Sequence, residues 1–401
     1  MKTDVSNLQL SQTRKVSYAE FALIAVALLC ATKFCTLPSV LAGAAGSKAI
    51  WVTATLVIIE SVTLFFATKI AKTGGLFRLD LKKPLRVSFA ILYLAFFLIK
   101  LTAFTREIAS YYALSLFENI PVLPVAAVYL IACVLLASKG FAGIGRVLEV
   151  FLWLFVFVFL FILIFTTTKG DFFNFLAMFN PDFGGFGKGI LFACAWFGDA
   201  SVVCFLDLSG ERNPVPRTEE REAAAESSPE EQPKESETNE KGKLSHKKKI
   251  AFVALFFSLA LILAFYAIFT SVYGDAAKMT DFAFIKLSAF KANADELGSA
   301  DWPVIFLWAT IGVIYLSLVF LAGRECFCSL KESAGTPVQK DFSCFAILGI
   351  AALALSTTFL DEEGDYISFM TRIANAAAIL ISLSTVALGI FAMMKNKEKE
   401  K

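Results

Sequence analysis

The sequence has very little histidine and few charges for its length. His246 is its one histidine and lies in a charged segment, which excludes histidine catalysis inside the protein. Only 18% of its 401 residues are charged and 57% are hydrophobic, so a soluble domain of this composition could not bury its nonpolar surface. No Ser or Thr follows Gly187 and Lys188 as a phosphate loop requires. Seven of the eight cysteines lie inside apolar runs or at their predicted cytoplasmic ends, and the pair Cys326 and Cys328 lacks metal-finger spacing. All eight are interpreted as reduced packing residues. We therefore expect a membrane protein that is not an enzyme, has no catalytic residues, and binds no metal, cofactor or nucleic acid.

Ten apolar stretches are each near the roughly 20 residues that a helix needs to cross about 30 Å of hydrocarbon. The first begins with Ser17 and Glu20, which form a capping box. The sequence thus predicts an all-α membrane protein with ten transmembrane helices, at 18–41, 49–68, 87–116, 121–137, 147–168, 186–207, 250–273, 302–322, 342–360 and 366–393.

The basic residues predict the orientation. With a cytoplasmic N-terminus, the segments on the inside hold 27 Lys and Arg residues. Those on the outside hold six, counting Lys188 at the outer end of the span 186–207. Cytoplasmic loops of membrane proteins carry such an excess of positive charge. We expect a multi-pass membrane protein with both termini in the cytoplasm.

The segments outside the spans differ in character. Residues 1–17 and 394–401 are the predicted cytoplasmic ends, and 208–249 separates spans 18–207 from spans 250–393. This long segment has runs of charge and no apolar periodicity, so we expect it to be a disordered cytoplasmic loop. Two outer segments, 171–179 and 280–291, place aromatic residues between polar ones, which is typical of interfacial helices. They are interpreted either as surface anchors or as an extracellular lid.

Ionisable residues at membrane depth indicate a polar interior, because each costs at least about 2.5 kcal/mol unless it is paired or hydrated. Lys33 lies too far from the end of its helix to reach the headgroups, so it needs an internal partner, with Asp199 and Glu60 as candidates. On the third helix we expect Glu107 to face the interior with Lys100. The predicted charge network comprises Glu60, Lys100, Arg106, Glu107 and Arg372, with Arg106 reaching the outer interface.

Two predicted helices carry breaks in mid-span. Helix 1 contains Ala31, Thr32 and Lys33 followed by Pro38, and helix 6 contains Gly198 and Asp199. Interrupted helices at corresponding positions of two halves are the best sequence indication of a transporter's central site. We expect a 5+5 inverted repeat with broken helices 1 and 6. The candidate substrate-binding residues are Ala31, Thr32, Lys33, Trp196, Gly198 and Asp199.

Several short motifs, taken in order, resemble the spore germination permeases, the permease-like subunits of nutrient germinant receptors within the amino acid–polyamine–organocation superfamily. The resemblance covers about residues 17–207 and 250–392. It is carried by Thr36-Leu37-Pro38, Arg106-Glu107 with Leu116-Phe117 and Pro121, Lys139-Gly140-Phe141 with Gly145-Arg146 and Glu149, Phe197-Gly198-Asp199, and Asp301-Trp302.

Three departures from the family pattern bear on function. The superfamily's glycine pair in helix 1, whose amides hold a substrate carboxylate, is replaced by Ala31-Thr32-Lys33. The ion site expected between helices 1 and 8 has no evident sodium ligand beyond Ser317, and the 208–249 loop is longer than expected. Lys33 could therefore receive the substrate carboxylate, or it could stand where related carriers bind sodium.

Two functions fit this pattern. The resemblance implies a subunit that binds a small amino acid or similar nutrient in spore germination and signals to a membrane-anchored receptor subunit and a lipoprotein. It also implies a location in the bacterial cytoplasmic membrane or the spore inner membrane. The alternative is a proton-coupled amino-acid transporter in which Asp199 or Glu107 titrates. Both require the same pocket, so the sequence leaves the choice open.

Overall fold

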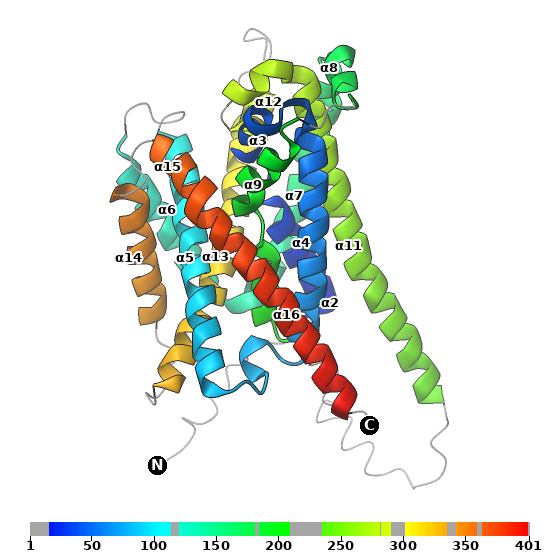
Figure 1. Ribbon diagram of the computed structural model, residues 1–401, viewed down its shortest axis with the longest axis vertical. Helices are drawn as coiled ribbons and strands as arrows, with labels where there is room; N and C mark the ends of the chain where they lie inside the picture. Colours follow the sequence, from blue (N-terminus) through cyan, green and yellow to red (C-terminus); the bar gives the residue numbers. More distant parts are fainter. Residues whose placement is uncertain are drawn as a thin grey trace.

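The structure is a computed structural model that describes residues 16–113, 120–180, 184–208, 235–280, 282–289, 301–334, 342–358 and 363–399. Within these ranges the regular structure is helical (Figure 1). The elements other than the two broken helices are η1 (Gly46–Lys48), α4 (Ala49–Lys72), η2 (Leu76–Arg78), α5 (Lys83–Tyr111), α6 (Val122–Ala137), α7 (Gly140–Thr167), α8 (Phe172–Ala177), α11 (Glu235–Tyr273), η6 (Gly274–Met279), α12 (Ala283–Ala289), α13 (Asp301–Ser333), α14 (Ser343–Thr358), α15 (Glu363–Phe369), η7 (Met370–Ala374) and α16 (Asn375–Lys399).

The first broken helix consists of α2 (Tyr18–Cys30) and α3 (Leu37–Ala45). The predicted capping box starts α2: the Ser17 hydroxyl accepts the Glu20 amide and the Glu20 carboxylate accepts the Ser17 amide. Pro38 lies in the first turn of α3, where a missing amide donor costs least. The residues between α2 and α3 leave helical hydrogen bonding at the predicted place.

The second broken helix consists of α9 (Phe186–Ala193), the 3₁₀ turn η4 (Cys194–Trp196) and the 3₁₀ helix η5 (Asp199–Phe205). Phe197 is extended, and Gly198 has a φ of 88°, which favours glycine because it lacks a Cβ. A Cβ at Gly198 would also lie 3.2 Å from Cζ of Phe96. The break therefore lies just before Asp199, as the sequence predicted.

The two broken helices lie together inside the bundle. α2 packs against η5, and α3 packs against α9. Around them α13 lies along α5, α16 along α4, and α11 along α2. Figure 1 shows α16 crossing the bundle obliquely, with α8 and α12 at the end opposite to its C-terminus. We call these two ends the α12 end and the α16 end.

Among the described residues, seven helices are long and apolar enough to cross a membrane by length and composition, and α2, α6 and α14 are shorter apolar helices. The surface agrees with this assignment, because α7 exposes Trp153, Phe157 and Ile164 on one face. A stripe of this kind suits contact with lipid. The structure is thus an all-helical membrane protein.

The start of α11 differs from the start expected for the seventh span. α11 begins at Glu235, so residues 235–249, which we expected to be part of a disordered loop, have helical backbone. The remainder of that segment, residues 209–234, lies outside the described residues. Charged helices can extend beyond the hydrocarbon because their backbone hydrogen bonds are internal, so an absence of apolar periodicity did not mark the start of this helix.

Candidate functional site

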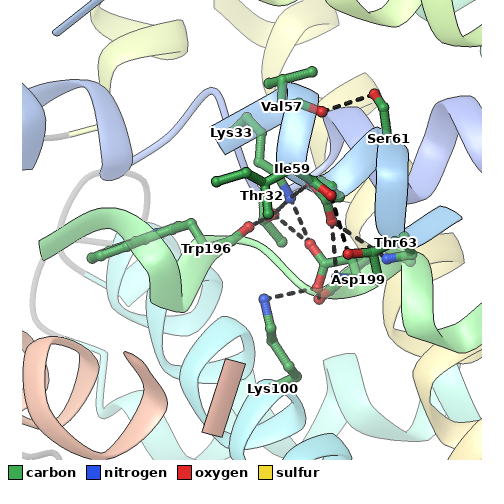
Figure 2. A network of polar contacts seen from close by, with 12 residues as sticks. Thr32, Lys33, Val57, Ile59, Ser61, Thr63, Lys100, Trp196 and Asp199 are labelled. Carbon is green, nitrogen blue, oxygen red and sulfur yellow. Dashed lines mark hydrogen bonds and ion pairs between the residues drawn. The ribbon is translucent and has the colours of Figure 1, made fainter. Parts of the chain in front are cut away.

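A buried ion network lies where the two broken helices meet. Lys33 Nζ is 2.6 Å from Oδ2 of Asp199 and 3.5 Å from Oε2 of Glu60. Lys100 Nζ approaches the other carboxylate oxygen of Asp199, Oδ1, at 2.7 Å from the opposite side (Figure 2). All four side chains are buried. Two ammonium groups thus balance two carboxylates, which is the condition for charges to be tolerated inside a bundle.

Hydroxyl groups complete the surroundings of Asp199. Thr32 Oγ1 lies 3.0 Å from its Oδ2, and the Tyr315 hydroxyl donates to its Oδ1 at 2.8 Å. The Thr32 oxygen also accepts from Lys33 Nζ at 2.9 Å. Lys33 Nζ further lies 4.9 Å from the centroid of the Phe197 ring, within cation–π range. The Lys33 ammonium is therefore surrounded and has no exposed surface.

Glu60 caps η5, the second half of the second broken helix (helix 6 of the sequence prediction). Its Oε1 accepts the backbone amides of Asp199 at 2.9 Å and Ala200 at 3.3 Å, the first two residues of η5. Amides at a helix N-terminus lack partners within the helix, and a carboxylate there is electrostatically favourable. Glu60 therefore stabilises the break at Gly198 as well as pairing with Lys33.

Glu107 caps α3, the second half of the first broken helix, in the same way. Its Oε1 accepts the amide of Thr36 at 3.0 Å and the Thr36 hydroxyl at 2.8 Å, at the N-terminus of α3. Its Oε2 accepts only the Tyr366 hydroxyl, at 3.3 Å. No lysine or arginine forms an ion pair with Glu107 among the described residues. Glu107 thus differs from Glu60 in having no cationic partner there.

The carbonyl groups freed by the break in helix 1 are bound by α11 and α12. Tyr266 of α11 donates its hydroxyl to the carbonyl of Lys33 at 3.1 Å. The amides of Ala283 and Phe284, at the start of α12, donate to the carbonyls of Cys35 and Phe34, both at 3.0 Å. α12 lies within the segment 280–291 that was predicted to be interfacial. Its backbone contacts connect the α12 end directly to the central site.

A small cavity lies beside the ion network, toward the α12 end. It offers about 10 Å³ to the centre of a water molecule, which is room for roughly one water. Its walls combine two charged side chains with hydroxyl, aromatic and aliphatic groups: Thr32, Lys100, Ala103, Phe104, Glu107, Ala195, Trp196, Tyr315, Tyr366 and Met370. The central site is therefore closed in this structure.

A larger cavity of about 220 Å³ lies toward the α16 end. Arg78, Asp207 and Arg324 are among its lining residues, and Arg78 pairs with Asp207 at 2.8 Å. Phe205 forms part of its wall and packs edge-on against Tyr93 and Phe97. We call this cavity the vestibule. Since η5 runs from Asp199 to Phe205, this one short helix connects the ion network with the vestibule.

The structure brings together most of the predicted site residues. The six predicted substrate-binding residues all lie at the two breaks and are buried: Ala31, Thr32, Lys33, Trp196, Gly198 and Asp199. Ala31 and Gly198 have no polar side chain and contribute only their backbone. Trp196 donates its indole N–H to Oγ1 of Thr36 at 3.2 Å. Figure 2 shows Thr32, Lys33 and Trp196 converging near Asp199.

Two expectations for the charge network are wrong. Arg372 is exposed on the π-helical turn η7 and takes no part in the buried contacts, although its position in the sequence suggested that it would. Arg106 is buried rather than reaching the outer interface. In addition, Lys100 pairs with Asp199 and not with Glu107, although both line the small cavity.

Sequence reasoning missed several uncharged residues of the site. Thr36, Tyr266, Tyr315 and Tyr366 supply its hydroxyl contacts. Asn375 contacts the backbone of broken helix 6 through the Ala195 amide and the Leu191 carbonyl. Asn375 could have been identified from the sequence, because an asparagine in an apolar stretch is buried and its amide needs partners. No sequence feature distinguished the three tyrosines from ordinary aromatic residues.

The described residues contain no group of three His, Cys, Asp or Glu side chains that could hold a metal ion. Glu60 and Asp199, the two acids of the ion network, both contact the Lys33 ammonium. A second ammonium, that of Lys100, adds further positive charge. The residues present therefore do not suit a divalent cation at the centre of this site.

The fold is that of a membrane transporter. A crystal structure of the Eremococcus coleocola manganese transporter, in complex with an aromatic bis-isothiourea substituted compound, superposes with a TM-score of 0.58 at 14% sequence identity. The match covers 96% of this chain and 80% of that one. A point mutant of the same transporter gives a TM-score of 0.57 at 15% identity, covering 92% and 78%. At such identities the likeness concerns the fold alone.

The family is indicated by a more specific match. Residues 15–181 match the family model described as spore germination protein. The match includes the motifs from Thr36-Leu37-Pro38 to Glu149 and supports, over these residues, the resemblance to the spore germination permeases. No curated protein sequence matches the chain.

Proposed function

We propose that the protein is a permease-fold subunit that binds a small amino acid or similar nutrient and reports its presence in spore germination. The observation that carries this proposal is the closed, charge-balanced site at two facing helix breaks, with a cavity beside it. Helix breaks at the centre of a bundle expose backbone groups to a ligand at membrane depth. The family match supports the germination role, for which the partners would be a membrane-anchored receptor subunit and a lipoprotein.

Lys33 acts, in this proposal, as a built-in cation. Its ammonium is fully buried and contacts Asp199, Glu60 and Thr32, so it has no surface to offer a substrate carboxylate. Of the two roles open from the sequence, this favours the position of a coupling ion over that of a carboxylate receptor. It also argues against a metal cargo such as the manganese of the similar transporter, because a lysine ammonium repels divalent cations.

The two halves support an inverted repeat of ten spans. Each broken helix has an acidic side chain at the N-terminus of its second half: Glu107 at α3 and Glu60 at η5. We propose that both termini are cytoplasmic, so that the vestibule at the α16 end opens to the cytoplasm. α12 is then an extracellular lid, since its amides bind the carbonyls of Phe34 and Cys35.

A binding screen tests the proposal. The purified protein in detergent would be incubated with each of the twenty amino acids and with nucleosides, and its melting temperature would be measured. We expect one or a few small amino acids to raise that temperature by the mass-action stabilisation that a ligand gives the folded state. A chain that acts only as a scaffold would show no shift with any of these compounds.

A proton-coupled amino-acid transporter is the second candidate, and Glu107 is the observation that favours it. Glu107 is buried without a cationic partner among the described residues, as expected of a carboxyl group that takes up and releases a proton. Uptake of a radiolabelled amino acid into reconstituted vesicles separates the candidates. Concentration of the amino acid driven by a pH gradient would identify a carrier, whereas binding without net uptake would identify a sensor.

A further inference from the structure

Two charged groups of opposite sign face the small cavity with capacity left to bind a ligand. Lys100 and Glu107 both line it, and both side chains are about 96% buried. Their positions are seven residues apart on α5, which places the Cα atoms about 10 Å from each other on one helix face. No ion pair joins the two side chains in the described structure.

The Lys100 ammonium has donors to spare. It lies 2.7 Å from Oδ1 of Asp199 as an ion pair, and among the described residues Nζ has no other acceptor. An ammonium carries three N–H donors, and leaving them unmade when buried is costly. The Lys33 ammonium differs, because it donates to both Asp199 and Thr32.

The Glu107 carboxylate has acceptor capacity to spare. Its Oε1 accepts both donors of Thr36, whereas among the described residues Oε2 has only the contact of 3.3 Å to Tyr366. The ions of the neighbouring network already balance one another, since Lys33 and Lys100 face Asp199 and Glu60. A cation brought by a ligand would therefore meet Glu107 as an uncompensated negative charge.

From this geometry we infer that the cavity recognises a zwitterion, with the ligand carboxylate on Lys100 and the ligand ammonium on Glu107. An α-amino acid carries these two groups a few ångströms apart, so one ligand in this cavity can contact both side chains that line it. The other walls include Ala103, Phe104 and Met370, so the side chain of the ligand is small and apolar. This inference rests on the proposed function and assigns its ligand class and orientation.

The cavity has room for about one water, so binding requires its walls to move. Met370 is the wall residue best suited to withdraw, because its side chain is unbranched and it begins the π-helical turn η7. Hydroxyl groups of Thr32 and Tyr315 also line the cavity and can follow the ligand carboxylate.

A charge-deletion experiment on both partners tests it. Binding to the purified full-length protein would be measured by thermal shift and titration with L-alanine, with L-alaninamide (which lacks the carboxylate) and with propionate (which lacks the ammonium). We expect both analogues to bind the wild-type protein at least roughly 10-fold more weakly, since each loses a hydrogen bond to a charged group. If L-alanine does not bind, the amino acid from the screen that does is used with its own amide and deamino analogues.

Substitutions of Lys100 and Glu107 show which side chain binds the ligand carboxylate and which binds the ligand ammonium. Glu107→Gln should weaken amino-acid binding roughly 10- to 100-fold and abolish the preference over the deamino analogue, while keeping the preference over the amide. Lys100→Gln should do the converse. Glu149→Gln, on the exposed face of α7, is the matched control and should leave binding unchanged. Should either neutral variant fail to fold, Glu107→Asp and Lys100→Arg keep the charge and should weaken binding while preserving both preferences.

The outcomes separate the inference from the proposed function. Binding of amino acids with unchanged preferences in both neutral variants, or equal binding of all three compounds to the wild-type protein, would overturn the zwitterion assignment and leave the proposed function standing. Binding of none of the twenty amino acids would overturn both.

Discussion

The most informative perturbation is the removal of the Lys33 charge, because the network predicts which second substitution repairs it. Lys33→Met leaves Glu60 and Asp199 to share a single ammonium, that of Lys100. Breaking a buried ion pair by removing one partner costs about 3–5 kcal/mol, because the remaining charge stays desolvated. We expect a loss of this size in the free energy of unfolding.

The repair should be unequal for the two acids. Asp199 keeps Lys100 at 2.7 Å and the Tyr315 hydroxyl, whereas the one ion pair of Glu60 in the described structure is with Lys33. Adding Glu60→Gln restores neutrality, keeps the Lys100–Asp199 pair, and retains an amide oxygen for the N-terminus of η5. Adding Asp199→Asn also restores neutrality but removes the acid that faces Lys100. We therefore expect the Glu60→Gln double variant to recover about 1–3 kcal/mol more than the other.

The assay is reversible unfolding in mixed micelles with increasing dodecyl sulfate, followed by tryptophan fluorescence. Trp196 and Trp308 are buried and report on the core. Both single acid variants complete the two double-mutant cycles. Equal recovery, or better recovery with Asp199→Asn, would refute the assignment of Glu60 as the acid that depends on Lys33. A cost below about 1 kcal/mol for Lys33→Met would refute the network as a source of stability.

Three further predictions concern the helix breaks. Gly198→Ala should cost about 1–3 kcal/mol in unfolding free energy because of its positive φ and the contact with Phe96. Gly187→Ala should be neutral, because its new methyl group meets nothing within 4 Å. Equal effects of the two substitutions in the same titration would contradict this. Asn375→Ala should cost about 1–3 kcal/mol, because it leaves backbone groups of broken helix 6 without partners; an unchanged unfolding midpoint would count against that contact. Tyr266→Phe removes the hydroxyl on the Lys33 carbonyl and should cost about 1 kcal/mol in the free energy of unfolding; an unchanged unfolding midpoint would count against that hydrogen bond.

The breaks and the main ion pair could be predicted from the sequence because they rest on local rules. Three sequence features each have one structural consequence at membrane depth. Pro38 and the glycine before Asp199 interrupt a helix, and a lysine too deep to reach the headgroups needs an internal partner. The expectation that Lys33 contacts Asp199 or Glu60 followed from depth alone, and the structure has both contacts.

The rest of the site depends on helix rotation and tertiary packing, which periodicity does not determine. The spacing of Lys100 and Glu107 placed them on one face, but it could not show that Lys100 turns to Asp199 on another helix. Tyr315 and Tyr366 read as ordinary aromatic residues until their hydroxyl partners were known. Arg372 was assigned to the network by depth, although its side chain faces outward.

The central claim, that Lys33 replaces a coupling ion in an amino-acid site, is tested most directly by measuring the dissociation constant of the best-binding amino acid in sodium chloride and in choline chloride. The wild-type protein should bind equally well in both media, because the ammonium is already in place. Lys33→Gly should lose binding, or regain it only in sodium. A wild-type protein that needs sodium, or a Lys33→Gly variant that binds normally in both media, would contradict the account.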